Sequence, residues 1–390
     1  MKVVIFQYRL FHYRVDLFER LRAACVARGI QLELVTGQAF GKERLKNDEG
    51  ELSWAHRVRN VYFPIVEKKD LCWQPMPRGL KDVDLVIFMQ ENRLIANLFW
   101  ILRRKLAGGP LVAYWGHGRD FQSRAPGGFR ERGKTALIKA VEWWFAYTRI
   151  TCGILAAAGF PEHRTTCLNN AIDVGGLRRD WEAAPPEVVA RIRGECGLAD
   201  GDVVGLFCGS LYPDKKLDLL VAACDRIRRQ VPNFRLVVVG DGASREQLVR
   251  DLATRPWAKW VGAQRGQAKA VYFGLATVVL NPGSVGLHVL DAFSMGLPMI
   301  TTATALHGPE IAYLEHRVNG LATAESADAY AGSVIDLLND GARLRAMSAA
   351  ARSSSDRYTL DNMVGNFVAG IEGALALRRD VADRRANATL

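Results

Sequence analysis

The stretch that decides the fold, Thr277–Thr302, reads TVVLNPGSVGLHVLDAFSMGLPMITT. Its β-branched start, Thr277–Leu280, predicts a buried strand. The turn residues Asn281–Ser284 follow, then apolar residues at helical spacing, and a second strand begins at Met299. This order predicts a strand–loop–helix–strand unit whose loop directs backbone N–H groups at an anion such as a diphosphate. An ordinary crossover with a turn glycine would produce the same pattern.

Strands alternate with helices through the whole chain, which predicts an α/β protein with parallel, doubly wound sheets. Loops after the first-half strands, at Tyr8–Tyr13, Gln90–Arg93 and Gly116–Gln122, occupy the usual ligand position of such sheets. The predicted strands are Val3–Phe6, Gln31–Val35, Asp84–Phe88 and Leu111–Trp115 in the first half, and Val203–Phe207, Arg235–Val239, Trp257–Val261, Thr277–Leu280 and Met299–Thr302 in the second.

A proline-bearing break, Ala183–Glu187, separates the two runs of alternation. We therefore expect two Rossmann-like domains that face each other across a cleft, at residues 1–175 and 176–362. The apolar segment 363–377 predicts a final helix that crosses back to the first domain. Residues 378–390 are polar, and we expect them to be a frayed tail.

The composition is that of a soluble globular protein, with 390 residues, 49% hydrophobic and 24% charged. Seven widely spaced cysteines without a CxxC pair fit reduced thiols in a cytosolic protein. Neither a signal peptide nor a membrane span is expected. The net charge of +11 favours an anionic partner such as a nucleotide phosphate or an acidic membrane, or serves solubility alone. No nucleic-acid-binding module is present, so nucleic acid is not an expected partner.

The segment Gly209–Lys216, GSLYPDKK, follows the predicted strand Val203–Phe207. A lysine in the first turn of a helix is unfavourable because its charge opposes the helix dipole. A phosphate bound beside Lys215 would make the charge of this lysine favourable. A solvated lysine pair is the alternative interpretation. The turn Gly240–Gly242 follows the next strand and carries little information alone.

These motifs, in their order and spacing, resemble the retaining glycosyltransferases of family 4, which have the two-domain GT-B architecture. The resemblance covers residues 165–375 best. It rests on Asn170–Asp173, Gly209–Lys215, Val239–Gly242, Pro282–Pro298, Pro309–Ile311 and Asn319–Gly320.

The resemblance implies transfer of a sugar, with retention, from a nucleotide diphosphate donor to a glycan or lipid-linked acceptor. We also expect a role in bacterial surface polysaccharide synthesis, a cytoplasmic location at the inner face of the membrane, and no metal or other cofactor. A nucleotide-sugar-binding subunit without turnover and a GT-B nucleotide-sugar epimerase are the rival hypotheses.

In the donor domain the resemblance places the diphosphate on Gly209, Lys215 and the backbone of Gly286, Leu287 and His288. His288 could add positive charge there, or be a partly exposed helix histidine.

The sequence departs from the family pattern at three positions. Ser210 stands where the family usually has an arginine, so it offers a hydroxyl without a charge. The two glutamates that normally flank the phosphate loop are replaced by Gly283 and Asp291. The resemblance gives Asp291 the ribose hydroxyls. Glu310 is our candidate for a replacement carboxylate, with a helix-capping effect as the alternative.

In the first half, His117 lies between two glycines after a predicted strand. The resemblance makes it the acceptor-domain histidine that lies near the donor sugar, and a turn histidine is the alternative. Glu91 is a weaker acceptor-site candidate, since it could instead form an ion pair with Arg93.

Residues 137–148 place their apolar side chains on one face of a predicted helix. Such a helix, with basic residues nearby, could lie on an anionic membrane, or it could pack on its own sheet. The apolar residues are Leu137, Ile138, Val141, Trp144, Phe145 and Thr148, and the basic ones are Arg130, Arg132, Lys134 and Lys139.

Overall fold

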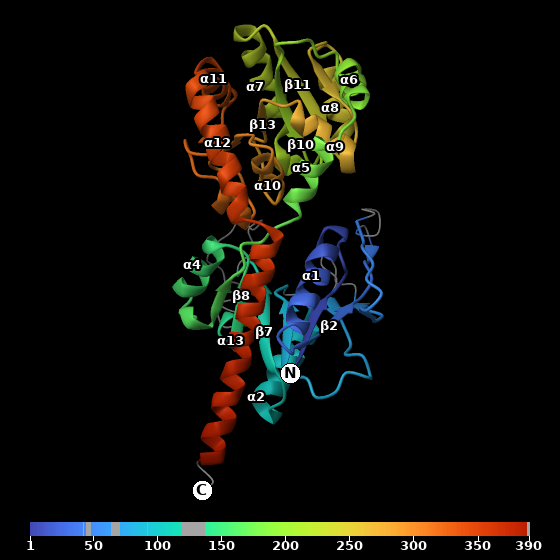
Figure 1. The fold of residues 1–390 in the computed structure, drawn as a ribbon, viewed down its shortest axis with the longest axis vertical. Helices are drawn as coiled ribbons and strands as arrows, with labels where there is room; N and C mark the ends of the chain where they lie inside the picture. The colour runs from blue at the N-terminus through green and yellow to red at the C-terminus, as the bar shows by residue number, and fades with distance from the viewer. Residues whose placement is uncertain (42, 44–47, 64–70, 92, 119–136, 388–390) are drawn as a thin grey trace. The chain divides into compact units, whose positions relative to one another are not determined.

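The computed structural model describes residues 1–41, 43, 48–63, 71–91, 93–118 and 137–387 (Figure 1). Its contacts divide the chain into two compact units. Unit 1 comprises Met1–Ile172 together with Leu360–Leu390, and unit 2 comprises Asp173–Thr359. Each unit is built on a parallel sheet, which confirms the predicted α/β class.

The main sheet of unit 1 has seven parallel strands in the order β3-β2-β1-β6-β7-β8-β9. A separate antiparallel pair, β4 with β5, stands beside it. The strands are β1 (Lys2–Gln7), β2 (Gln31–Thr36), β3 (His56–Arg57), β4 (Val61–Phe63), β5 (Leu71–Trp73), β6 (Leu85–Met89), β7 (Leu111–Gly116), β8 (Trp143–Ala146) and β9 (Thr165–Cys167).

Helices cover both faces of this sheet. One face packs on α2 and α4 through a core that contains Ile101 and Leu155. On the other face, the Trp115 ring packs edge-on against Phe18 of α1 and Phe367 of α13, with ring centroids 6.1 and 5.1 Å apart. The helical segments are η1 (His12–Arg14), α1 (Val15–Val26), α2 (Ile95–Ala107), α4 (Arg149–Ala157), η3 (Glu162–Arg164) and α13 (Leu360–Asn387).

Helix α13 lies beside α1 in unit 1 (Figure 1). Its backbone stays helical to Asn387, so the expectation of a frayed tail from residue 378 is wrong. A polar composition does not by itself oppose a helical backbone.

The predicted amphipathic helix at 137–148 is also wrong, because residues 143–146 form strand β8. Trp144 is fully buried on one face of the sheet, where its indole N–H donates to the Ile138 carbonyl at 2.9 Å. Phe145 is fully buried on the other face, where it stacks on Phe367 with ring centroids 4.7 Å apart. Neither side chain can reach a membrane. The basic residues at 130, 132 and 134 lie outside the described residues.

The sheet of unit 2 has six parallel strands in the order β12-β11-β10-β13-β14-β15. The strands are β10 (Val203–Cys208), β11 (Phe234–Val239), β12 (Ala258–Trp260), β13 (Val278–Leu280), β14 (Met299–Thr302) and β15 (Gly320–Thr323). The helical segments are α5 (Val174–Glu182), α6 (Pro186–Glu195), η4 (Pro213–Lys215), α7 (Leu217–Gln230), α8 (Arg245–Leu252), α9 (Gly266–Gly274), α10 (His288–Ser294), η5 (Pro309–Tyr313), α11 (Ala327–Asn339) and α12 (Gly341–Arg357).

Each sheet has one point where the strand order reverses. In unit 1 this point lies between β1 and β6, and in unit 2 between β10 and β13. Loops that leave the carboxyl ends of such neighbouring strands diverge to opposite faces and leave a crevice where ligands bind in this class of sheet. The two switch points therefore locate the candidate sites.

Candidate active site

At the switch point of unit 2, the loop after β10 packs directly on the loop after β13. A Cβ atom built on Gly283 would lie 2.2 Å from the carbonyl oxygen of Asp214 and 2.4 Å from the Cα atom of Lys215. The Ser284 N–H donates to the Asp214 carbonyl at 2.9 Å. A side chain at position 283 would collide with this backbone, so the glycine is what allows the two loops to meet.

Lys215 stabilises the contact between the loops after β10 and β13. Its ammonium group donates to the Ser284 carbonyl oxygen. Burial lowers the pKa of Lys215, although neighbouring Asp214 acts in the opposite direction. The lysine ends η4, before α7 begins at Leu217, so our placement of it in the first turn of a helix is wrong. It is a half-buried cation that joins two loops, not a solvated lysine.

The end of β11 comes equally close to the end of β10. Gly240 has φ +147°, and a Cβ there would lie 1.8 Å from the Gly209 carbonyl oxygen. The Gly209 N–H donates to the Val239 carbonyl at 3.0 Å. Ser210, next in the chain, is exposed. The Gly240–Gly242 turn thus positions the backbone of the Gly209 loop.

The loop that leads into α10 has unused backbone donors. No described residue accepts a hydrogen bond from the N–H of Gly286 or Leu287. A Cβ on Gly286 would meet nothing within 4 Å, so the loop faces open space at that point. Backbone N–H groups beside open space are suited to an anion.

His288 begins α10 beside this loop. Its Nε2 atom is shielded from solvent and has no hydrogen-bond partner among the described residues. Burial lowers the pKa of His288 well below 6.5, and the charges of Lys215 and Lys269 act in the same direction. The ring is therefore neutral at pH 7 in the empty site, and a charged ring beside a bound diphosphate stays a prediction.

Asp291 and Lys269 form a buried ion pair one turn further along α10. The Lys269 ammonium lies 2.8 Å from Asp291 Oδ2, and the Asp291 side chain is only 8% exposed. Burial lowers the pKa of Lys269, but Asp291 and Cys208 together outweigh it and the net shift is upward. One oxygen of the predicted ribose-binding carboxylate is thus already occupied by a lysine.

Glu310 lies against the same loop. It is buried in η5, and its Oε2 atom would be 2.8 Å from a Cβ built on Gly308. That same Cβ would lie 3.1 Å from the Val285 carbonyl oxygen. A carboxylate is therefore present beside the loop that contains Val285.

The sequence interpretation did not single out His307. The His307 Nδ1 atom accepts from the Val285 N–H at 3.2 Å, and Nε2 donates to the Thr302 carbonyl at 2.8 Å. These two bonds require a neutral ring. Burial lowers the pKa of His307, and nearby Lys215 acts in the same direction, which is consistent with this state. His307 thus ties the loop before α10 to β14.

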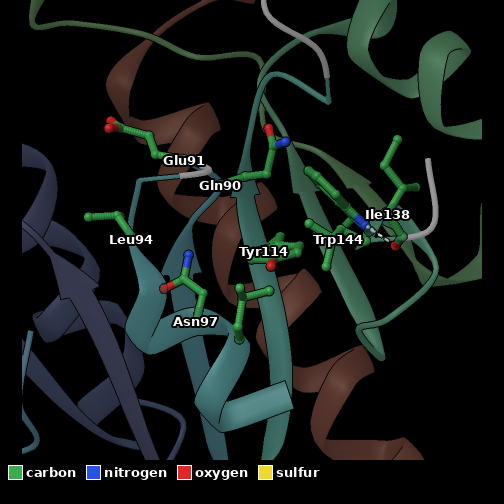
Figure 2. Close-up of a pocket in the computed structure, with 9 residues that line it drawn as sticks. Gln90, Glu91, Leu94, Asn97, Tyr114, Ile138 and Trp144 are labelled. Atoms are coloured by element: carbon green, nitrogen blue, oxygen red, sulfur yellow. Dashed lines mark hydrogen bonds between the residues drawn. The ribbon is translucent and has the colours of Figure 1, made fainter. Parts of the chain in front are cut away.

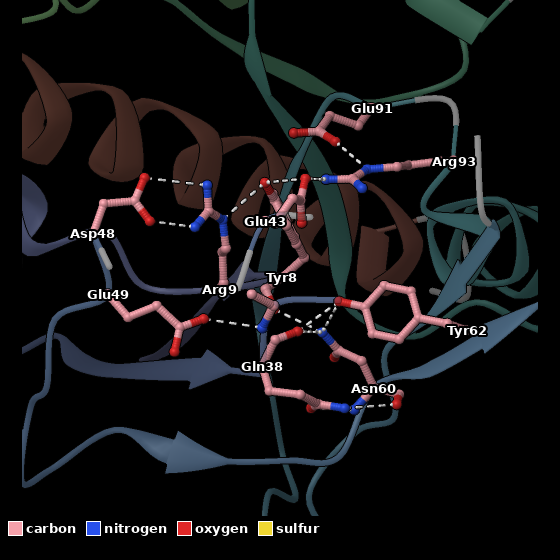
Figure 3. Close-up of polar contacts among 11 residues, drawn as sticks. Tyr8, Arg9, Gln38, Glu43, Asp48, Glu49, Asn60, Tyr62, Glu91 and Arg93 are labelled. Atoms are coloured by element: carbon pink, nitrogen blue, oxygen red, sulfur yellow. Dashed lines mark hydrogen bonds and ion pairs between the residues drawn. The ribbon is translucent and has the colours of Figure 1, made fainter. Parts of the chain in front are cut away.

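In unit 1, the loops after β1 and β6 meet in a polar network (Figure 3). Arg93 pairs with Glu91 at 2.8 Å and with Glu43 at 3.1 Å, and its guanidinium lies 4.3 Å from the centre of the Tyr8 ring. The ion pair that we weighed as the alternative for Glu91 is therefore present. Glu91 also borders the pocket described next, so both interpretations remain.

A small pocket opens at the carboxyl ends of β6, β7 and β8 (Figure 2), with a volume of about 30 Å³. That is room for only a few water molecules. Apolar and polar groups share its wall, as is usual for ligand pockets. The lining residues are Gln90, Glu91, Leu94, Asn97, Leu98, Tyr114, Leu137, Ile138 and Trp144.

His117 directly follows β7, and it shares a neighbour, Tyr147, with the buried Arg14. The His117 ring meets the Tyr147 ring edge-on, with centroids 4.2 Å apart. Arg14 donates to the Tyr147 hydroxyl at 3.3 Å, and its guanidinium lies 4.4 Å from the centre of the Trp115 ring. Arg14 is only 5% exposed, yet no carboxylate among the described residues forms an ion pair with it.

Arg9, on the same loop, provides a contrast. It is 3% exposed and pairs with Asp48 through two hydrogen bonds at 2.5 and 3.4 Å (Figure 3). A buried cation is costly unless an anion compensates it. Arg9 has that compensation from Asp48, whereas among the described residues the side chain of Arg14 meets aromatic rings and a hydroxyl.

Residues 202–340 match the family model described as glycosyl transferases group 1. The chain is 30% identical over 200 residues to a GDP-mannose-dependent α-(1-6)-phosphatidylinositol monomannoside mannosyltransferase of Mycolicibacterium smegmatis, covering 48% of this chain and 50% of that one. It is 27% identical over 270 residues to a D-inositol 3-phosphate glycosyltransferase of Segniliparus rotundus, covering 64% and 57%. The chain thus spans about half the length of these curated relatives.

The crystal structure of Anabaena HepE in complex with UDP superposes with a TM-score of 0.68 and 16% identity, covering 95% of this chain and 100% of that one. At this identity the likeness shows the fold, and that fold is GT-B, as predicted.

Proposed function

We propose that this chain, which carries a glycosyl transferases group 1 domain at residues 202–340, transfers a sugar from a nucleotide diphosphate donor to a glycan or lipid-linked acceptor. The contact of Gly283 with Lys215 carries the proposal. It brings a half-buried ammonium group beside a loop with unused N–H donors, and these groups together are suited to a diphosphate.

In the proposed mechanism the sugar is transferred with retention by attack on the face that the nucleotide leaves. Lys215 and the N–H groups of Gly286 and Leu287 stabilise the charge that grows on the departing diphosphate. A leaving phosphate oxygen takes the acceptor proton. His117 lies on the acceptor side, and Asp291 and Glu310 contact the donor's ribose and sugar. No metal or other cofactor takes part.

The proposal for the acceptor is based on Arg14. This arginine lies at the N-terminus of α1, where the helix dipole also disfavours a cation. An anionic group on the acceptor would offset the cost of burying the Arg14 charge and its unfavourable interaction with the helix dipole. A lipid-linked glycan carries such a group in the phosphate that joins it to its carrier. We therefore propose a phosphate-bearing acceptor, a role in bacterial surface polysaccharide synthesis, and a cytoplasmic location at the inner face of the membrane.

One experiment separates this function from its rivals. A thermal-shift screen of nucleotide sugars identifies the donor, because a ligand well above its dissociation constant raises the melting temperature. The donor is then incubated with and without lipid-phosphate-linked glycans, and nucleoside diphosphate release is followed. Transfer predicts release that depends on the acceptor. An epimerase would convert the donor with no acceptor present, and a binding subunit would stabilise on donor addition without any release.

A further inference from the structure

Helix α2 of unit 1 exposes an apolar side. Leu98, Phe99, Leu102 and Leu106 are 45%, 47%, 56% and 78% exposed. The helix buries its other side, with Ala96, Asn97 and Ile101 in the protein interior. Large apolar side chains scattered over a surface are common, but a contiguous group on one helix marks an interaction site.

The exposed side has the geometry of a helix that lies on a membrane. At 3.6 residues per turn the four apolar residues fall within an arc of about 100°. Arg103 and Lys105 are exposed and flank this arc on opposite sides. Long basic side chains in these positions can reach the headgroups while the apolar stripe enters the acyl boundary. We call these six residues, Leu98, Phe99, Leu102, Arg103, Lys105 and Leu106, the α2 face.

The apolar surface continues on the neighbouring strands. The Phe99 ring meets the Trp73 ring of β5, with centroids 5.6 Å apart. Val61 and Phe63 of β4, which pairs with β5, are each 46% exposed. The continuation makes the apolar surface broader than one helical stripe.

We propose that the α2 face is a membrane-docking surface that binds a bilayer containing anionic lipids. The basic residues on both flanks favour such a bilayer over a neutral one. Among the described residues, no helix is long and apolar enough to cross the bilayer, so the binding is at the interface. Leu98 also lines the pocket at the carboxyl ends of β6 to β8, so docking brings that pocket to the lipid surface. This last link rests on the proposed lipid-linked acceptor, whereas the docking itself does not.

Co-sedimentation of the full chain with vesicles of phosphatidylcholine, with and without phosphatidylglycerol, tests the proposal. The wild type is expected to bind the anionic vesicles and to dissociate in high salt. Leu102→Ser/Leu106→Ser should lose binding by about tenfold or more, because it removes the two most exposed apolar contacts. Arg103→Gln/Lys105→Gln should lose the preference for anionic vesicles. Val249→Ser, at a 42% exposed position of α8 in unit 2, is the matched control and should bind like wild type.

Thermal unfolding checks that the leucine variant is folded, which its exposed positions predict. Wild-type protein that stays in the supernatant, or a folded leucine variant that binds like wild type, would overturn the proposal. So would a wild-type dimer in sedimentation velocity that the leucine variant loses, because the face would then bind a second copy. Donor turnover with a water-soluble acceptor should be unchanged in the leucine variant. A failure of vesicle binding is therefore distinguishable from a failure of the proposed transferase activity.

Discussion

Gly283 and Lys215 lie so close that a Cβ atom on the glycine would be 2.4 Å from the Cα atom of the lysine. The residues are 68 positions apart in the chain, and they meet because β10 and β13 are neighbours at the switch point of the sheet. A glutamate, which the resemblance to family 4 leads one to expect at position 283, cannot be accommodated in this arrangement. The close approach of the two loops therefore depends on a glycine at position 283.

Replacing Gly283 should cost stability even with the smallest side chain. Gly283→Ala pushes a methyl group into the backbone of Asp214 and Lys215, and overpacking of this kind costs about 1–3 kcal/mol. Gly286→Ala is the matched control, because a Cβ there meets nothing within 4 Å. Urea unfolding of both variants measures the difference. Equal unfolding midpoints would show that the two loops separate easily.

Nucleotide binding should strengthen as the pH falls. In the empty site the pKa of His288 is well below 6.5, so the ring is neutral at pH 7. A bound diphosphate favours the protonated ring and raises this pKa. Binding then takes up a proton, and affinity for the nucleoside diphosphate should rise between about pH 8 and pH 6. Calorimetry across this range measures the slope. His288→Leu should retain only the slope that comes from the nucleotide's own titration, and an unchanged slope would place His288 outside the site.

The two buried histidines of the site, His288 and His307, should make the ligand-free protein less stable in acid. The folded-state pKa values of His288 and His307 are both below the unfolded value of about 6.5. The unfolded chain then binds more protons, so the stabilisation is complete above about pH 6.5 and is lost as the pH falls below it. Unfolding free energies measured from about pH 8 to pH 5 should show this fall. A folded His307→Gln variant should show a shallower one, and an identical profile would argue against the neutral ring described above.

Arg14 and Arg9 should respond differently to the same substitution. Arg9→Gln strands Asp48 and breaks a buried pair, which costs on the order of 3 kcal/mol of stability. Arg14→Gln removes a buried cation that has no described carboxylate partner, so stability should change little. With a phosphate-bearing acceptor, Arg14→Gln should raise the acceptor KM about tenfold or more, while the donor KM is unchanged. If Arg14→Gln destabilises the protein as much as Arg9→Gln does, Arg14 has a structural partner and the acceptor assignment fails.

The fold could be predicted from the sequence wherever strands and helices alternate cleanly. The strands of unit 2 from β10 to β14 lie where the β-branched runs placed them. Strand β8 could not be assigned, because it is buried on both faces and its neighbours continue the apolar pattern. A short apolar run of that kind has no period that distinguishes a strand from a helix.

In the candidate site, the predicted residues Gly283 and Lys215 are brought together, and they make contacts that the sequence did not predict. Lys215 bonds the Ser284 carbonyl, and His307 bonds the Val285 N–H. Both contacts join segments that become neighbours only when the sheet folds. Neither contact produces a local pattern in the sequence. Arg14 did leave a weak signal, an arginine directly before the apolar stripe of a helix, where the dipole disfavours it.

The central claim, that the donor diphosphate binds where Lys215 meets the Gly283 loop, is tested most directly by calorimetry of the preferred nucleoside diphosphate with Lys215→Ala. Loss of a charge-assisted hydrogen bond should weaken binding by about 1.5–3 kcal/mol, roughly 10- to 150-fold. Lys216→Gln, which removes the neighbouring charge, should bind within about twofold of wild type. Because Lys215 also holds the Ser284 carbonyl, the apo variant should be somewhat less stable, so titrations are made well below its melting temperature. The account predicts a large loss for Lys215→Ala alone, and a wild-type affinity in that variant would contradict it.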